Sequence, residues 1–153
     1  MKNEKDSVVI LVADDDPDDC LLIREAFKRG LLVNGLRFVE DGEELIDYLR
    51  HQGKYGDPSL APRPGIILLD LNMPRKDGRE ALKEIKSDPD LRSIPVVILT
   101  TSKDEEDILR SYDLGANSFI TKPVTFPGLV DAVKSLGKYW FEIVDLPLER
   151  KES

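Results

Sequence analysis

Five side chains that can handle metal ions and phosphate groups follow short apolar runs of the sequence. Asp14 and Asp15 follow the first run and Asp70 follows the third. Thr100 closes the fourth run, and Lys122 comes shortly after the fifth. If these runs are strands of one open parallel sheet, their carboxyl ends meet at one edge, where such sheets bind ligands. The sequence therefore predicts three carboxylates, a hydroxyl and an ammonium group around one crevice.

The three carboxylates of this cluster would repel one another. Two carboxylates about 4 Å apart cost about 4 kcal/mol at an effective dielectric constant of about 20. Lys122 brings one positive charge, which does not balance three negative ones. A hard divalent cation would balance them better. Mg²⁺ fits best because it needs few protein ligands and leaves positions for water and phosphate oxygens, and Mn²⁺ could replace it.

A carboxylate beside bound Mg²⁺ is a nucleophile for phosphoryl transfer. The metal and Lys122 would neutralise charge on the transferring group, and Thr100 would donate a hydrogen bond to one of its oxygens. We therefore predict that Asp70 accepts a phosphoryl group in a Mg²⁺-dependent reaction.

The residues between these groups predict the elements that position them. Continuous apolar runs rich in β-branched residues suit strands buried on both faces, and segments of helical periodicity follow each run. The strands are expected at residues 8–13, 36–39, 66–69, 96–99 and 119–120. The helices are expected from Pro17 to Gly30 and around residues 45–49, 78–88, 108–115 and 129–140. The apolar face of the first helix is expected to include Leu22, Ile23, Ala26 and Phe27. This alternation predicts an α/β fold with a doubly wound parallel sheet covered by helices on both faces.

Length and charge limit the functions of the chain. Its 153 residues suit one domain, expected over residues 7–146, with flexible termini at 1–6 and 147–153. With 22 basic and 30 acidic residues the net charge is −8, which argues against binding nucleic acid or an anionic membrane. No apolar run approaches the roughly 20 residues of a membrane span. The charged start lacks the apolar segment of a signal peptide, and Cys20 has no partner for a disulfide, so we expect a cytoplasmic protein.

The chain resembles the receiver domain of bacterial two-component response regulators over about residues 7–138. The resemblance rests on Asp14-Asp15, on Leu69-Asp70-Leu71-Asn72-Met73-Pro74 with Gly78, on Leu99-Thr100-Thr101 and on Lys122-Pro123. Each piece is weak alone, but the set in this order and spacing is specific. The resemblance implies a flavodoxin-like (βα)5 fold with strand order 2-1-3-4-5 in three α/β/α layers.

The same resemblance assigns metal ligands. Asp70 would be the phosphoacceptor, Asp15 would bind the metal directly and Asp14 through water. The backbone carbonyl of Asn72 would complete the protein ligands. Asn72-Met73-Pro74 could otherwise be an ordinary turn.

Other roles follow from the family's pattern. Thr100 would sense the phosphoryl group, Lys122 would pair with it, and Phe119 would be the switch aromatic. The Lys122-Pro123 peptide would be cis. Asn72, Thr101 and Ser102 are expected to modulate the lifetime of the phosphorylated state.

Two segments resemble the small regulators paired with bacterial phytochromes. One is the long loop 51–65, with Tyr55 and several prolines, and the other is the ending 140–147. The resemblance implies a sensor histidine kinase as partner, which could be a bacterial phytochrome, and a homodimer formed through the last helix. Tyr139, Trp140 and Phe141 cannot all face the core because helical neighbours lie about 100° apart. At least one of them is therefore available to a partner or a second copy.

Some residues have simpler explanations. Asp14, Asp15 and Asp16 could form no more than a solvated turn, and Asp16 is expected to be the N-cap of the helix that begins at Pro17. His51 is expected at the surface, and Cys20 as a small core or boundary residue.

Three functions remain open. The first is a response regulator that receives its phosphoryl group from a kinase phosphohistidine. It would reshape the face formed by the fourth and fifth expected helices (108–115 and 129–140) and the fifth expected strand (119–120). It would dephosphorylate itself but would not be a turnover enzyme. The second is a phosphatase with an aspartyl-phosphate intermediate, which would need a second Asp where Asn72 stands. The third is a flavin-binding electron carrier, which this acidic crevice serves poorly because it lacks a phosphate-binding loop.

Overall fold

The computed structural model describes residues 9–29, 35–71, 73, 75–100, 115, 118–121 and six residues between 127 and 135. Of residues 100 and 118–121 it describes the backbone alone. The strands are β1 (Ile10–Ala13), β2 (Leu36–Val39), β3 (Ile66–Leu69), β4 (Val96–Thr100) and β5 (Ser118–Thr121). The helices are α1 (Pro17–Arg29), α2 (Gly42–Arg50) and α3 (Gly78–Ser87). Two short 3₁₀ turns, η2 (Gly53–Tyr55) and η3 (Pro58–Leu60), follow α2.

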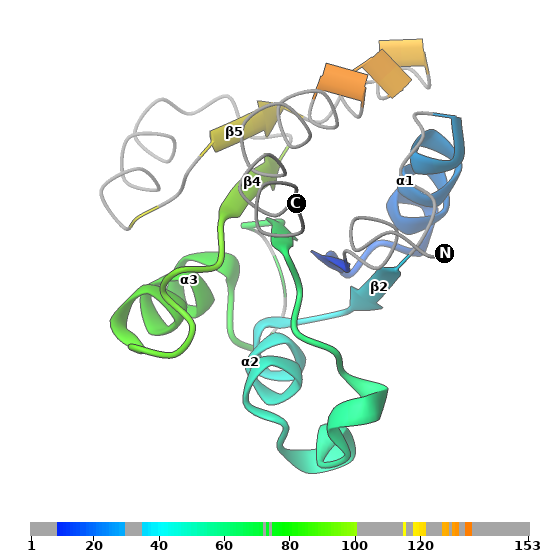
Figure 1. The fold of residues 1–153 in the computed structure, drawn as a ribbon. Helices are drawn as coiled ribbons and strands as arrows, with labels where there is room; N and C mark the ends of the chain where they lie inside the picture. The colour runs from blue at the N-terminus through cyan, green and yellow to red at the C-terminus, as the bar shows by residue number, and fades with distance from the viewer. Residues whose placement is uncertain are drawn as a thin grey trace, which may run out of the picture.

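The five strands form one parallel sheet in the order β2-β1-β3-β4-β5 (Figure 1). The predicted strand order and doubly wound topology are confirmed. β1 is the central partner of β2 and β3, with Ala13 paired to both Val39 and Leu69. The ends of β1, β2 and β3 are therefore level, so residues that follow them emerge at one edge.

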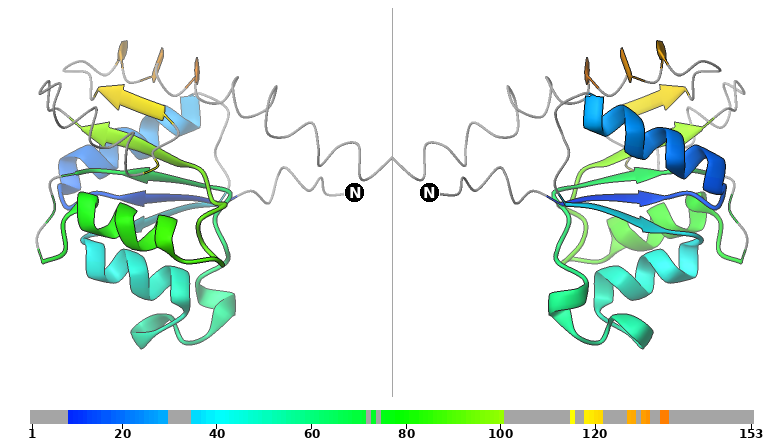
Figure 2. Two further views of the ribbon diagram at one scale, coloured as in Figure 1. Left: turned by 90° about the vertical axis from the view of Figure 1, so that its left-hand side faces the viewer. Right: turned by 90° about the vertical axis from the view of Figure 1, so that its right-hand side faces the viewer.

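The helices lie on both faces of the sheet, as predicted. α1 covers one face, and α2 and α3 cover the other (Figure 2). Strand residues alternate between two buried clusters: Leu11 and Ile67 pack with α2 and α3, whereas Val12 and Leu68 pack with α1. β1 and β3 are buried along their whole length, which explains why their sequences are continuous apolar runs rather than alternating ones.

The first helix differs in one respect from its predicted apolar face. Ile23, Ala26 and Phe27 are buried, but Leu22 is 41% exposed. Helical periodicity alone did not show how wide the covered stripe is. Asp16 caps the helix as predicted, because its Oδ1 accepts a hydrogen bond from the Asp18 N–H at 2.9 Å.

The long loop 51–65 is folded back on α2. The Tyr48 hydroxyl donates to the Pro62 carbonyl at 2.8 Å, and the Tyr48 and Tyr55 rings meet edge to face. His51, predicted at the surface, is half-buried with a left-handed backbone, and its Nε2 lies 2.8 Å from the Ala61 carbonyl oxygen. His51 therefore ends α2 and contacts the later part of the loop at Ala61.

Several predictions fall outside the described residues. These are the helix around 108–115, the cis peptide at Lys122-Pro123 and the termini 1–6 and 147–153. Of the last helix, residues 127–128, 130–131 and 134–135 are helical, and Val130 packs against the cluster beneath α1. No helix within the described part of the chain is long and apolar enough to cross a membrane.

Candidate metal centre

Two of the candidate acids are held by the backbone of the sheet. Asp14 follows β1 directly, and its N–H donates to the Val39 carbonyl of β2 at 3.0 Å. Asp70 follows β3 directly, and its N–H donates to the Ala13 carbonyl of β1 at 3.0 Å. Both acids thus continue the hydrogen-bond ladder one residue beyond the strands, which fixes their positions side by side.

Asp14, Asp15 and Asp70 form the predicted cluster. One carboxylate oxygen from each lies within 4.8 Å of the others. Asp14 and Asp70 are buried, at 1% and 6% exposure, whereas Asp15 is exposed. The cluster therefore has two acids in its floor and one at its mouth.

The donors of this cluster fit a hard divalent cation. All three are carboxylate oxygens, which Mg²⁺ and Mn²⁺ prefer, and the exposed side leaves space for water and phosphate oxygens. Three negative charges at this spacing repel one another by several kcal/mol at an effective dielectric constant of about 20. A bound cation would remove that cost.

Asp16 is not part of the cluster, as the sequence predicted. Its side chain caps α1, and its own N–H donates to the Asp14 Oδ1 at 2.9 Å. Asp16 thus orients one of the two buried acids through its backbone. Cys20 is half-buried on α1, and its Sγ lies 3.5 Å from the Asp14 carbonyl oxygen.

A cleft of about 380 Å³ opens beside the cluster, between α1 and the end of β2. Asp14 and Asp15 line it together with Leu21, Arg24 and Phe38. The Arg24 guanidinium lies 4.8 Å from the centroid of the Phe38 ring. Sequence reasoning did not single out this pair, because the two residues lie 14 positions apart and neither belongs to a recognisable motif.

The remaining predicted site residues are placed only in part. The backbone of Thr100 ends β4 beside β3, at the same edge as Asp70, and pairs with Thr121 of β5. The backbone of Phe119 pairs with Ile98. The other predicted residues lie outside the described part of the chain: Asn72, Thr101, Ser102, Lys122, Pro123, Tyr139, Trp140 and Phe141.

The loop after Asp70 is closed tightly at its ends. The Gly78 N–H donates to the Leu71 carbonyl at 3.0 Å, and a β-carbon at Gly78 would lie 2.3 Å from the Asp70 carbonyl oxygen. Only glycine fits there. The Asp77 side chain then begins α3 through a reciprocal capping box with Glu80.

Comparison with known proteins connects this site to one family. Residues 10–134 match the response regulator receiver domain. The chain is 43% identical over 139 residues to the response regulator Rcp1 of Synechocystis, covering 91% of this chain and 92% of Rcp1.

Two solved structures are also similar. One is the phosphorylated cyanobacterial phytochrome response regulator RcpA, with a TM-score of 0.81, 45% identity and coverage of 88% of this chain and 94% of RcpA. The other is the Mn²⁺-bound form of Rcp1, with a TM-score of 0.79, 42% identity and coverage of 89% and 96%.

Proposed function

Because the chain belongs to the response regulator receiver family, we propose that it is a phosphoacceptor of two-component signalling whose phosphoryl group is carried by Asp70. One observation carries this proposal: Asp70 lies in a cluster with Asp14 and Asp15 at the carboxyl edge of the sheet. Asp70 is buried but borders the exposed Asp15, so a phosphodonor can reach it from the solvent side.

The proposed cofactor is Mg²⁺, with Mn²⁺ as a substitute. The all-carboxylate donor set supports it, as does the Mn²⁺-bound form of the relative Rcp1. Asp15 would bind the ion directly, Asp14 through water, and the Asn72 carbonyl would complete the protein ligands. When bound, the ion supplies positive charge that offsets the charge of the transferring phosphoryl group.

The transfer itself is a nucleophilic displacement by Asp70. One of its carboxylate oxygens forms a bond to phosphorus, the P–N bond of a phosphohistidine breaks, and the departing imidazole nitrogen takes up a proton. Thr100 would donate a hydrogen bond to a phosphoryl oxygen, and Lys122 would pair with another. Hydrolysis of the acyl phosphate by water would reset the protein, with Asn72, Thr101 and Ser102 setting its rate.

The proposed phosphodonor is a sensor histidine kinase, and a bacterial phytochrome is the favoured kind. The relatives support this choice, since RcpA is a phytochrome response regulator and is similar along most of the chain. We also propose a cytoplasmic protein. It would pass its signal on through the face formed by the expected helices around 108–115 and 129–140 and the strand around 119–120. Phe119 would act there as the switch aromatic, and a homodimer would form through the last helix near Tyr139, Trp140 and Phe141.

Phosphorylation by acetyl phosphate tests the acceptor. Wild-type protein with Mg²⁺ should gain one phosphoryl group, measured as an 80 Da increase by intact mass spectrometry, whereas Asp70→Asn should gain none. Asp16→Asn is the matched control, because its amide can still cap α1 and it lies outside the cluster. Labelling of Asp70→Asn at the wild-type level would disprove the assignment.

A further inference from the structure

The loop between β3 and α3 is anchored to the beginning of α2 by two contacts. Arg75 Nη1 lies 3.0 Å from the Asp41 Oδ2, and the Gly42 N–H donates to the Lys76 carbonyl at 2.9 Å. Asp41 is also the N-cap of α2, because its Oδ1 accepts from the Glu44 N–H at 2.8 Å. One carboxylate thus caps the helix with one oxygen and holds the loop with the other.

The fit between the loop and α2 leaves no spare room. A β-carbon at Gly42 would lie 2.1 Å from the Lys76 carbonyl oxygen. Arg75 adopts the left-handed backbone conformation, with φ 63°, which a side-chain-bearing residue enters only at a cost. Something must hold Arg75 in that conformation, and the paired Asp41, itself 5% exposed, is placed to do so.

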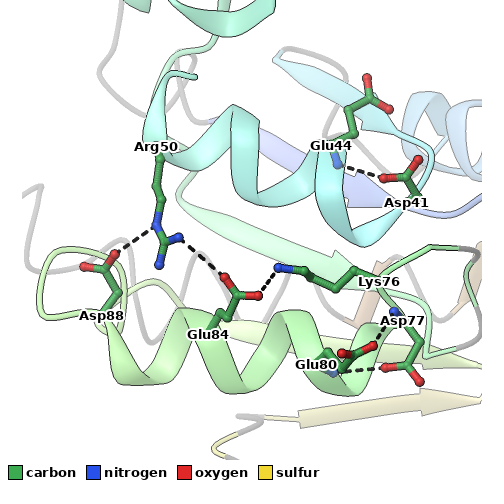
Figure 3. A network of polar contacts seen from close by, with 8 residues as sticks. All are labelled: Asp41, Glu44, Arg50, Lys76, Asp77, Glu80, Glu84 and Asp88. Atoms are coloured by element: carbon green, nitrogen blue, oxygen red, sulfur yellow. Dashed lines mark hydrogen bonds and ion pairs between the residues drawn. The ribbon is translucent and has the colours of Figure 1, made fainter. Parts of the chain in front are cut away.

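Lys76 ties the same loop to α3. Its ammonium group contacts the Glu84 carboxylate, which in turn lies 3.4 Å from the Arg50 guanidinium of α2 (Figure 3). Arg50 also contacts Asp88 at 3.3 Å. Arg50 belongs to the same charged network but touches α3 rather than the loop, so it offers a matched control.

Both ends of the loop are therefore fixed, by Gly78 against Asp70 and by residues 75 and 76 against α2. Between these anchors in the chain stands Asn72, whose carbonyl is one of the proposed metal ligands. An exposed ion pair would stabilise this arrangement little by itself, since the median contribution of such pairs to folding stability is near zero. Arg75 differs from that case because its partner is buried and its backbone is strained.

We propose that Asp41, Gly42, Arg75 and Lys76 form a clamp that holds the loop after Asp70 in place and thereby supports cation binding, with Arg75 as the positioning residue. The clamp rests on the proposed function, because it assumes that the acidic cluster binds a divalent cation. Arg75 pairs with Asp41, which is not one of the three clustered acids. It acts by fixing the loop that leads away from the phosphoacceptor.

Binding of Mn²⁺ to the full chain tests the clamp, followed by the electron paramagnetic resonance signal of the free ion. Arg75→Gln and Asp41→Asn should each weaken Mn²⁺ affinity about threefold to tenfold, at or below the usual effect of residues that support metal ligands. The Asn at position 41 can still cap α2. The double variant should bind no more weakly than the weaker single variant, and Arg75→Lys should recover part of the affinity.

Arg50→Gln is the control that distinguishes loss of the clamp from a general loss of stability. It removes charge from the network but should leave Mn²⁺ affinity unchanged. Amide hydrogen exchange without metal gives a second readout: the Gly42 N–H should exchange several times faster in Arg75→Gln than in Arg50→Gln. Circular dichroism identifies any variant that fails to fold, and Arg75→Lys then takes its place.

The outcomes separate the two proposals. Failure of the wild-type chain to bind Mn²⁺ would overturn the proposed function, and the clamp with it. Wild-type binding with unchanged affinity in both Arg75→Gln and Asp41→Asn would overturn the clamp alone.

Discussion

Gly78 packs directly against the backbone of Asp70, so closely that the Asp70 carbonyl oxygen occupies the place where a β-carbon would be. The contact joins the first residue of α3 to the last residue before the loop. It holds the start of that helix against the backbone of one of the clustered acids.

Replacing Gly78 with alanine is therefore expected to destabilise the protein. Alanine inside a helix normally makes the folded protein more stable than glycine does, by about 0.5–1 kcal/mol. Here the clash with the Asp70 carbonyl outweighs that gain, and we expect a loss of about 1–3 kcal/mol in the free energy of unfolding. Urea unfolding followed by circular dichroism measures it.

Gly56→Ala is the control for this change. Gly56 has a helical backbone. The atom nearest to a β-carbon added there is the Gly53 carbonyl oxygen, at an ordinary contact distance of 3.6 Å. We expect the stability to change by less than about 1 kcal/mol there. Equal effects at both positions would show that the contact with Asp70 does not matter.

Removing one charge from the cluster should raise the stability of the metal-free protein and lower the stabilisation gained from metal. Without metal, Asp15→Asn relieves repulsion with Asp14 and Asp70, and we expect the variant to be more stable by about 1 kcal/mol after solvent screening. With millimolar Mg²⁺, the wild-type melting temperature should rise more than that of the variant. Thermal melts in EDTA and in Mg²⁺ make the comparison, and a variant less stable than wild type in EDTA would contradict it.

The hydrogen bond between Tyr55 and Glu44 should depend on pH. Burial raises the pKa of the Glu44 carboxyl, but the Tyr55 hydroxyl at 2.6 Å, the Glu40 N–H and Lys54 together bring it below its usual value. Ionised Glu44 therefore contributes its full stabilisation of the folded state above its unfolded pKa of about 4.3. That stabilisation is lost as the pH falls through the lower, folded pKa. Tyr55→Phe should cost about 1 kcal/mol at pH 7 and less in acid.

Tyr48→Phe supplies the matched comparison. Its hydroxyl donates to the Pro62 carbonyl, which does not titrate, so the cost of losing it should be the same at both ends of the pH range. Urea unfolding at pH 7 and at pH 3.5 distinguishes the two variants. A cost for Tyr55→Phe that stays constant with pH would contradict the role of Glu44.

The sheet and the acidic cluster could be predicted because their signals are local. Ile66–Leu69 is a strand with the bounds that its apolar run predicted, and Asp14 and Asp70 meet because they follow neighbouring strands. The exposure of Leu22 could not be predicted, since it depends on how much of α1 the sheet covers.

The contacts that hold the loops were also invisible in the sequence. Arg75 pairs with Asp41 across 34 positions, and Tyr48 reaches Pro62 only because loop 51–65 folds back on α2. The contact of His51 with the Ala61 carbonyl was invisible for the same reason. No periodicity or motif reports a long-range contact between single side chains.

The amide groups of Asp14 and Asp70 belong to the sheet, although their side chains belong to the site. If Asp70 carries a phosphoryl group, as proposed, its backbone is held by the Ala13 carbonyl and has little freedom to retreat from the added charge. We then expect the displacements in the surrounding loops and helices rather than in the strand ends. Two peptide groups would thereby set the direction in which the signal travels.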